Sequence, residues 1–512
     1  MNLGAQLARS SITSLLNVIT ATIVALVLPP VLLSYITLEV YGVWALITVV
    51  NAYVALLDLG FQSSLVVLIA NASAKKDDER ILDLVNGAFW IYCGLFAVTS
   101  GLSYSLAPVL SAWLFSGDSQ YAFALYAYTV VCLINLLGTP FSGLLRGFQR
   151  YDKANFCDIA ALLINAGVTI LLITHSWGLW AMIAGAAAGG ITRCAGYRIL
   201  GRGEFSKLAI DWRIGALKRV MPGLIRLSPS DQSIRLNSVI TQTLIRVSIN
   251  TFAGVAAVGA YDIGKRIVGQ VGTMSAVIFA PLTPAATVLA ARIEPDRVRE
   301  LVDKSVFYLA LVTLPTTCFV IFFVKPFLQL WLGNVDVSQI SLVARLLMLG
   351  TMLELFTGPL TTIALGLSNV SLVLTKIAMS ILLSVSLIPV LGNFFSFEGV
   401  LAGEFAAMVI SSFVAMVIFY RRYGMPTLVR LGWVLKRTAM ACSLASIATG
   451  VVWVTNSGLS AQPSLYALGT MVLVFAASTG IAYWHLGLIS AAEIVQLWGL
   501  TRRGKSPQEK RR

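Results

Sequence analysis

Long apolar segments recur along the whole chain, and they decide the class of fold. A helix that crosses a bilayer needs roughly 20 mainly apolar residues, and we count fourteen such segments. They lie at 11–36, 41–70, 84–114, 121–146, 154–174, 177–199, 217–252, 255–291, 304–324, 338–366, 370–391, 396–419, 434–455 and 464–487. Outer-membrane strands are about ten residues long and alternate in polarity. The segments therefore predict an all-α polytopic membrane protein with about 14 transmembrane helices.

The composition agrees with this class. Only 12% of the residues are charged, against about 25% in soluble domains. The six cysteines lie in or beside apolar segments without C-x-x-C spacing, and the two histidines are isolated. We therefore expect no metal site, no cofactor and no catalytic residues.

One short motif resembles a nucleotide site. Gly259, Gly264 and Lys265 fit G-x-x-x-x-G-K, but Arg266 stands where the phosphate-binding loop needs a hydroxyl residue. That loop also follows a strand and opens a helix, whereas these residues lie inside an apolar segment. We interpret Lys265 and Arg266 as cations within a span, with Asp262 one turn before Arg266 as its partner.

The basic residues predict the orientation in the membrane. Of the 37 lysines and arginines, 29 fall in alternate connections and one, Lys325, falls in the opposite ones. Basic loops stay on the cytoplasmic side, so both termini are predicted to be cytoplasmic. Most of the net charge of +14 then reflects topology and contact with anionic lipids, and we expect no nucleic-acid partner.

Seven basic residues remain inside the predicted spans. A charge at the middle of a span costs about 2.5–3.5 kcal/mol by insertion scales, so such groups are functional-site candidates. The seven are Arg226, Arg235, Arg246, Lys265, Arg266, Arg345 and Lys376. The last two lie near span ends, where long side chains can reach the interface.

The segment 217–252 carries a polar stripe. Its members recur at intervals of three, four or seven, which places them on one helical face. They are Asp231, Arg235, Ser238, Gln242, Arg246 and Asn250. A stripe this polar cannot face lipid, so it either lines a substrate path or packs against other helices, with Asp231 neutralising Arg235.

The chain also contains an internal repeat. Matches at offsets of 219 to 221 residues join Val18, Tyr41, Pro140 and Gly178 to Val239, Tyr261, Pro359 and Gly399. The repeating unit holds six helices, an even number, so the two copies share one orientation and are related by a pseudo-two-fold axis along the membrane normal. Such lobes enclose a central cleft and move by alternating access.

The repeat predicts the organisation of the chain. We expect an N-terminal lobe at 1–200, a C-terminal lobe at 214–422, two further helices at 433–488 and a basic cytoplasmic tail at 489–512.

Four stretches resemble a known family. They are YGVWALITVVNAYVALLDLGFQSSL from Tyr41 to Leu65, LLRGFQRYDKAN from Leu144 to Asn155, VGAYDIGKRI from Val258, and FLQLWLG from Phe327 to Gly333. Together they resemble the polysaccharide transporter and O-antigen flippase branch of the multidrug/oligosaccharidyl-lipid/polysaccharide exporter superfamily. The resemblance implies a pair of six-helix lobes in the bacterial inner membrane. It also implies transfer of an undecaprenyl-diphosphate-linked oligosaccharide, an O-antigen or exopolysaccharide repeat unit, from the cytoplasmic to the periplasmic leaflet.

The chemistry of the buried charges favours an anionic substrate, because arginine forks suit phosphate oxygens. The expected diphosphate-binding residues are Arg226, Arg235, Gln242, Arg246, Lys265 and Arg266. The expected buried acids are Asp58, Asp231, Asp262 and Glu354, acting either in coupling to H⁺ or Na⁺ and gating or in packing. A cation-coupled multidrug exporter and a lipid II flippase are the alternatives. An enzyme is disfavoured because no large loop is present, and the expected partners are the lipid-linked oligosaccharide, anionic lipids and other polysaccharide-assembly membrane proteins.

Overall fold

The fold is entirely helical wherever the structure describes the chain. The computed structural model describes residues 3–58, 60–115, 119–206, 220, 229–279, 295–333, 335–367, 369–423, 436, 438–451 and 465–486. Each of the fourteen predicted segments coincides with helix in these residues. Eight of the described helices are long and apolar enough to cross a membrane. The all-α, multi-pass class is therefore confirmed, while the predicted tail at 489–512 lies outside the described residues.

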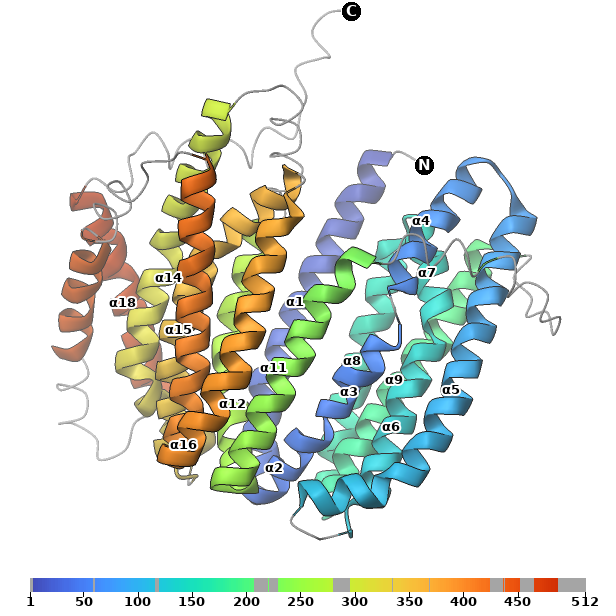
Figure 1. The fold of residues 1–512 in the computed structure, drawn as a ribbon, viewed down its shortest axis with the longest axis horizontal. Helices are drawn as coiled ribbons and strands as arrows, with labels where there is room; N and C mark the ends of the chain where they lie inside the picture. The colour runs from blue at the N-terminus through green and yellow to red at the C-terminus, as the bar shows by residue number, and fades with distance from the viewer. Residues whose placement is uncertain are drawn as a thin grey trace, which may run out of the picture. The chain divides into compact units, whose positions relative to one another are not determined.

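Figure 1 colours the helices in chain order, from blue at the N-terminus to red at the C-terminus. The first nine are α1 (Leu3–Leu33), α2 (Leu38–Ile47), α3 (Val49–Leu56), α4 (Phe61–Ala74), α5 (Asp78–Leu114), α6 (Ala122–Leu137), α7 (Thr139–Gly147), α8 (Tyr151–Thr174) and α9 (Leu179–Glu204). The later ones are α11 (Pro229–Ala253), α12 (Val255–Phe279), α14 (Pro295–Leu332), α15 (Ser338–Gly366), α16 (Val370–Tyr423) and α18 (Leu465–His485).

Some predicted segments are interrupted. The segment 41–70 was expected as one span, but it forms α2, α3 and α4, with breaks at Thr48 and before Gly60. Gly60 has φ of 74°, a left-handed conformation that glycine adopts without steric cost. The long α16 is two helices, as predicted, because the backbone is non-helical at Phe395 and Ser396.

By internal contacts the described helices form two compact units. The first contains Met1–Arg266 and Ile377–Ala407, and the second contains Ile267–Lys376 and Met408–Arg512. This division places α11 in the same unit as α1 to α9, so it does not follow the boundary expected between 200 and 214. The two six-helix lobes remain a prediction from the sequence repeat.

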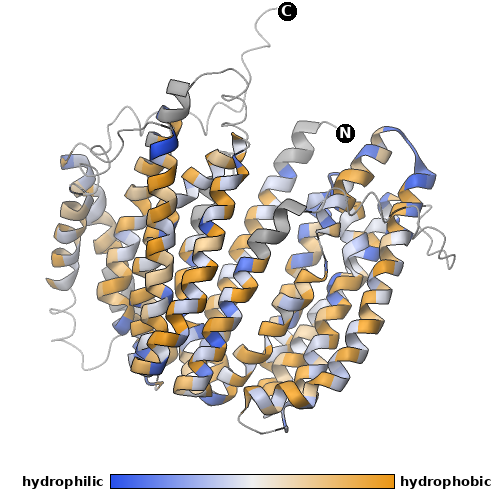
Figure 2. Cartoon of the chain, viewed as in Figure 1, coloured by the Kyte–Doolittle hydropathy of each residue, from blue (hydrophilic) through white to orange (hydrophobic). Residues whose placement is uncertain are grey.

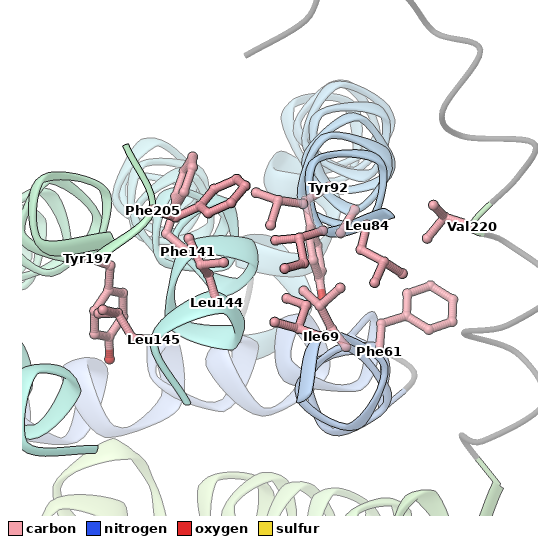
Figure 3. Close-up of a cluster of buried hydrophobic side chains, with 14 of the residues drawn as sticks. Phe61, Ile69, Leu84, Tyr92, Phe141, Leu144, Leu145, Tyr197, Phe205 and Val220 are labelled. Atoms are coloured by element: carbon pink, nitrogen blue, oxygen red, sulfur yellow. The ribbon is translucent and has the colours of Figure 1, made fainter. Parts of the chain in front are cut away.

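The first unit has a core of aliphatic and aromatic side chains from α4, α5 and α7. Five of these side chains are each 5% exposed or less, and Figure 3 shows them in one cluster: Phe61, Ile69, Leu84, Tyr92 and Leu144. Around this core α8 packs against α9 and α1, and α5 packs against α6. Of these helices, α1, α8 and α9 line the cavity described below.

The second unit has its own core. There α14 packs against α15 and α18, and the buried side chains include Leu309, Leu360 and Phe419. The hydroxyl of Tyr483 on α18 donates to the backbone oxygen of Leu311 on α14 at 3.0 Å, which satisfies a polar group that would be costly in lipid.

The outward faces of the helices are apolar. On α1, Ile12, Leu16, Ile19 and Ile23 recur at helical spacing and are 45–61% exposed. Figure 2 shows hydrophobic residues along the length of most helices. Soluble proteins rarely expose continuous apolar surface of this size, so these stripes are the lipid-facing surface of a membrane protein.

Two glycines let α2 and α12 approach closely. A Cβ atom on Gly42 would overlap the backbone oxygen of Val255, and a Cβ on Gly259 would approach the backbone oxygen of Leu38 to 2.5 Å. Small residues at helix crossings allow backbones in membranes to touch. This crossing brings Tyr41 of α2 next to the charged residues of α12.

We expect Gly42→Ala to lower the free energy of unfolding by about 1–3 kcal/mol, because the new methyl group forces two backbones apart. The matched control is Gly101→Ala on α5, where nothing lies within 4 Å of the added Cβ. That change should raise helix stability by about 0.5–1 kcal/mol. Thermal unfolding in detergent measures both, and equal effects from the two changes would contradict the close crossing.

Candidate functional site

The charged site is built on a helical hairpin in the first unit. Helices α11 and α12 are joined by the single residue Gly254, which has φ of 87°. Arg246 lies eight residues before this turn and Asp262 lies eight residues after it. At 1.5 Å per residue both lie about 12 Å from the turn, so the two antiparallel helices place them at the same depth.

Asp262 is the centre of a buried ion network. Its two carboxylate oxygens accept from Arg246 Nη2 at 2.8 Å and from Arg266 Nε at 2.9 Å. The hydroxyl of Tyr41 donates to the same carboxylate at 3.3 Å. Arg246 also donates to Gln242 Oε1 at 3.4 Å. The Asp262 side chain is 8% exposed, so its charge depends on these partners.

A second network lies on the neighbouring face of α12. Lys265 Nζ donates to the hydroxyl of Tyr261 at 2.6 Å, and that hydroxyl donates to Glu404 Oε1 at 2.9 Å. Lys265 Nζ also lies 3.3 Å from Glu404 Oε1. Glu404 belongs to α16 and its side chain is 5% exposed. This network is neutral, because one lysine faces one glutamate.

The sequence YDIGKR explains why the two networks are separate. It contains two i, i+4 pairs, Tyr261 with Lys265 and Asp262 with Arg266. Residues four apart share a helix face, while consecutive residues do not face each other. The first pair therefore contacts α16, and the second contacts α2 and α11.

A cavity of about 230 Å³ lies beside Arg266 in the first unit. Helices α1, α2, α8, α9 and α12 contribute to its walls, which include Tyr41, Trp44, Asn165 and Thr169. Arg266 is the one charged residue in this lining. Its side chain is 35% exposed, and the centre of its guanidinium group lies over the ring of Tyr41, 5.9 Å from the ring centroid. Among the described residues, no hydrogen bond or ion pair of its terminal nitrogens is found.

The structure brings together four of the six expected binding residues. The two connected helices of the hairpin contain Gln242, Arg246, Lys265 and Arg266. Arg226 lies outside the described residues, and the side chains of Asp231 and Arg235 do as well. The predicted pairing of Asp231 with Arg235 therefore stays a prediction, whereas the predicted pairing of Asp262 with Arg266 is confirmed.

The other expected acids lie elsewhere. Asp58 is buried in the turn after α3, where the hydroxyl of Tyr92 donates to it. Glu354 was expected to be buried, and this is wrong. Its side chain is 49% exposed on α15 in the second unit, and its Oε1 lies 3.6 Å from Lys376 Nζ. Hydropathy identifies the span but does not indicate which side of the helix is covered by neighbours.

Glu404 was not anticipated from the sequence. It is a lone carboxylate in the apolar stretch GVLAGEFAAMV, and the rule that marks ionisable residues in spans as functional candidates would have selected it. Arg246 and Lys265 also have partners that local spacing did not suggest. Counting these described side chains, three cations face two acids, so the hairpin has an excess charge of +1.

Comparison with known sequences gives one clear match. A family model described as Polysaccharide biosynthesis protein matches residues 31–335, which is more than half of the chain. No curated protein sequence matches the chain.

Comparison with solved structures gives the fold. An inward-facing multidrug resistance MATE family transporter of the MOP superfamily is similar with a TM-score of 0.67 at 13% identity, covering 79% of this chain and 94% of the other. The lipid II flippase MurJ, in an inward closed conformation, has a TM-score of 0.64 at 13% identity, covering 93% and 99%. A MATE transporter from Vibrio cholerae has a TM-score of 0.55 at 15% identity, covering 82% and 96%. The helical arrangement is therefore that of MOP-superfamily transporters.

Proposed function

The chain belongs to the polysaccharide biosynthesis protein family of multi-pass membrane proteins, and on this premise we propose that it is a lipid-linked oligosaccharide flippase. It moves a polyprenyl-diphosphate-linked oligosaccharide, an O-antigen or exopolysaccharide repeat unit on undecaprenyl diphosphate, from the cytoplasmic to the periplasmic leaflet. It works by alternating access in the bacterial inner membrane, with both termini in the cytoplasm, and it catalyses no covalent reaction.

One observation carries this proposal: two arginines share one buried carboxylate, and one of the two lines a cavity. Arg246 and Arg266 share the single carboxylate of Asp262, and Arg266 lines the cavity. A buried charge without a counterion is costly, so such an excess persists where a ligand supplies the missing charge. The planar guanidinium fork fits the oxygens of a phosphate group.

The membrane potential is one proposed energy source for this transfer. Moving one elementary charge through 100 mV changes its energy by about 2.3 kcal/mol. An outward-moving diphosphate with about two negative charges therefore gains about 4–5 kcal/mol from an inside-negative potential of that size. Coupling to H⁺ or Na⁺ through Asp58, Asp231, Asp262 or Glu354 is the alternative source.

Two other substrates remain as alternatives. One is a cationic drug, carried by a multidrug exporter of the same superfamily. The excess charge of +1 at the hairpin disfavours a cationic substrate, because like charges repel. A lipid II flippase would use the same diphosphate chemistry with a different sugar. Anionic lipids and other polysaccharide-assembly proteins are the proposed membrane partners.

Proteoliposomes containing the purified full chain test the proposal. We expect fluorescently labelled undecaprenyl-diphosphate oligosaccharide to reach the opposite leaflet at least tenfold faster than in protein-free liposomes, and an imposed potential to change the rate. Accessibility of the label to a membrane-impermeant quencher measures the transfer. Transport of a cationic dye in place of this lipid would favour the multidrug exporter, and transport of lipid II alone would favour the other flippase.

A further inference from the structure

The cavity beside Arg266 contains more than an anion site. Besides Arg266, its lining includes the polar or aromatic residues Trp44, Asn165, Thr169 and Tyr41. The other lining residues are apolar side chains, mainly from α1. Small-molecule sites have this composition, with apolar walls and a few polar groups that fix the orientation of the ligand.

The size of the cavity limits what it can hold. Its volume is about 230 Å³, whereas sites that enclose drug-sized molecules measure roughly 300–1,000 Å³. An oligosaccharide of several rings cannot fit inside, so the cavity holds one part of such a substrate.

The ring of Trp44 is held in one orientation by a neighbouring aromatic ring. The ring of Trp44 meets the ring of Tyr128 edge to face, with centroids 5.0 Å apart and an interplanar angle of 71°. Edge-to-face packing of this kind stabilises the orientation of both rings. A rigid indole offers a large apolar surface at low entropic cost, and the face of a pyranose ring presents C–H groups that pack on such a surface.

The side-chain amide of Asn165 has a hydrogen-bond donor that is not used within the described residues. The hydroxyl of Thr169 donates to Asn165 Oδ1 at 3.3 Å, which orients the amide group. Among the described residues no hydrogen-bond partner is found for Asn165 Nδ2. Because Asn165 lines the cavity, we take this N–H as the donor to a sugar hydroxyl or a phosphate oxygen.

We propose that this cavity recognises the junction between the diphosphate and the first sugar, with Arg266 on the phosphate and Trp44 and Asn165 on the sugar ring. The inference rests on the proposed function and deepens it, because it assigns the sugar-proximal part of the substrate to named residues of α2, α8 and α12. Outer sugars lie beyond the cavity. The site therefore selects the first sugar and tolerates variation farther along the oligosaccharide.

Equilibrium binding to the full chain in nanodiscs tests this assignment. Two lipids are compared: undecaprenyl diphosphate carrying the oligosaccharide, and undecaprenyl diphosphate without sugar. We expect Trp44→Leu to weaken binding of the sugar-bearing lipid by about tenfold, as loss of a central aromatic contact does, and to change binding of the sugar-free lipid by less than twofold. Asn165→Leu should give the same pattern, because an unmet sugar hydroxyl weakens binding.

Soluble competitors separate the sources of affinity. A hexose 1-phosphate should displace the labelled lipid at a lower concentration than either inorganic phosphate or the free hexose. Trp113→Leu is the matched control, because this tryptophan is 64% exposed on α5 and does not line the cavity. Equal loss of both lipids in Trp44→Leu, or loss of neither, would overturn the sugar assignment. If the wild-type chain binds neither lipid, both the sugar assignment and the proposed function are wrong.

Discussion

Replacement of Asp262 with asparagine is expected to lower the free energy of unfolding by about 3–5 kcal/mol, the cost of leaving buried charges without their partner. Two arginines depend on this carboxylate, at 2.8 Å and 2.9 Å. The asparagine side chain keeps the shape but removes the negative charge, so the repulsion between the two guanidinium groups is no longer offset, and Arg246, which is 12% exposed, loses its counterion. Unfolding in detergent, followed by circular dichroism, measures the loss.

A double-mutant cycle makes this prediction specific. Arg246→Met alone should cost less than Asp262→Asn, because it leaves Asp262 and Arg266 as a balanced pair. In the double variant, Arg246→Met should recover part of the loss caused by Asp262→Asn, because only one unpaired cation remains. The surface control is Glu79→Gln in the first turn of α5, where changes within about 0.5 kcal/mol are the norm. Additive losses in the cycle would contradict a shared network.

The second large effect concerns transport. We expect Arg266→Gln to slow transfer of the lipid-linked oligosaccharide by about 100-fold, equivalent to about 2.7 kcal/mol. This lies within the range of 2–5 kcal/mol for removing one member of a buried charge pair at an interface. The change removes the excess positive charge at the cavity, and it leaves Arg246 and Asp262 balanced. Stability should therefore change much less than in Asp262→Asn.

Two companion variants complete this test. Arg266→Lys should retain an intermediate rate, because lysine keeps the charge but cannot present a planar fork to phosphate. Arg202→Gln, an exposed arginine at the end of α9, controls for the loss of one positive charge and should transport at the wild-type rate. Wild-type transfer by a folded Arg266→Gln protein would remove Arg266 from the binding site.

Much of the fold follows from the sequence. Apolar segments of about 20 residues predict helices, because a bilayer offers no other partner for the backbone polar groups, and all fourteen coincide with helix where the structure describes them. Breaks within segments were missed where glycine or threonine interrupts an otherwise apolar run, as at Thr48 and Gly60. Hydropathy records the apolar character of a stretch, but it does not record a local change of backbone direction.

The candidate site was found from the sequence in part. The cations of α11 and α12 were selected because charges inside spans are rare. The sequence did not predict the ion-pair partners of these cations, with one exception. Arg266 and Asp262 are four residues apart on one helix, so their pairing could be predicted from the spacing. Glu404 lies 139 residues from Lys265, and no pattern along the chain indicates that the two meet.

The sequence by itself determined that this protein is a helical membrane protein with cations inside its spans, and that Asp262 and Arg266 share a helix face. These properties depend on composition and on spacing within one helix. The tertiary structure decided which charges are balanced and that Arg266 borders a cavity with Trp44 and Asn165. Those outcomes depend on the one-residue turn at Gly254 and on the close crossing of α2 with α12. Ion pairing requires contact within a few ångströms, and contacts between helices are set by packing.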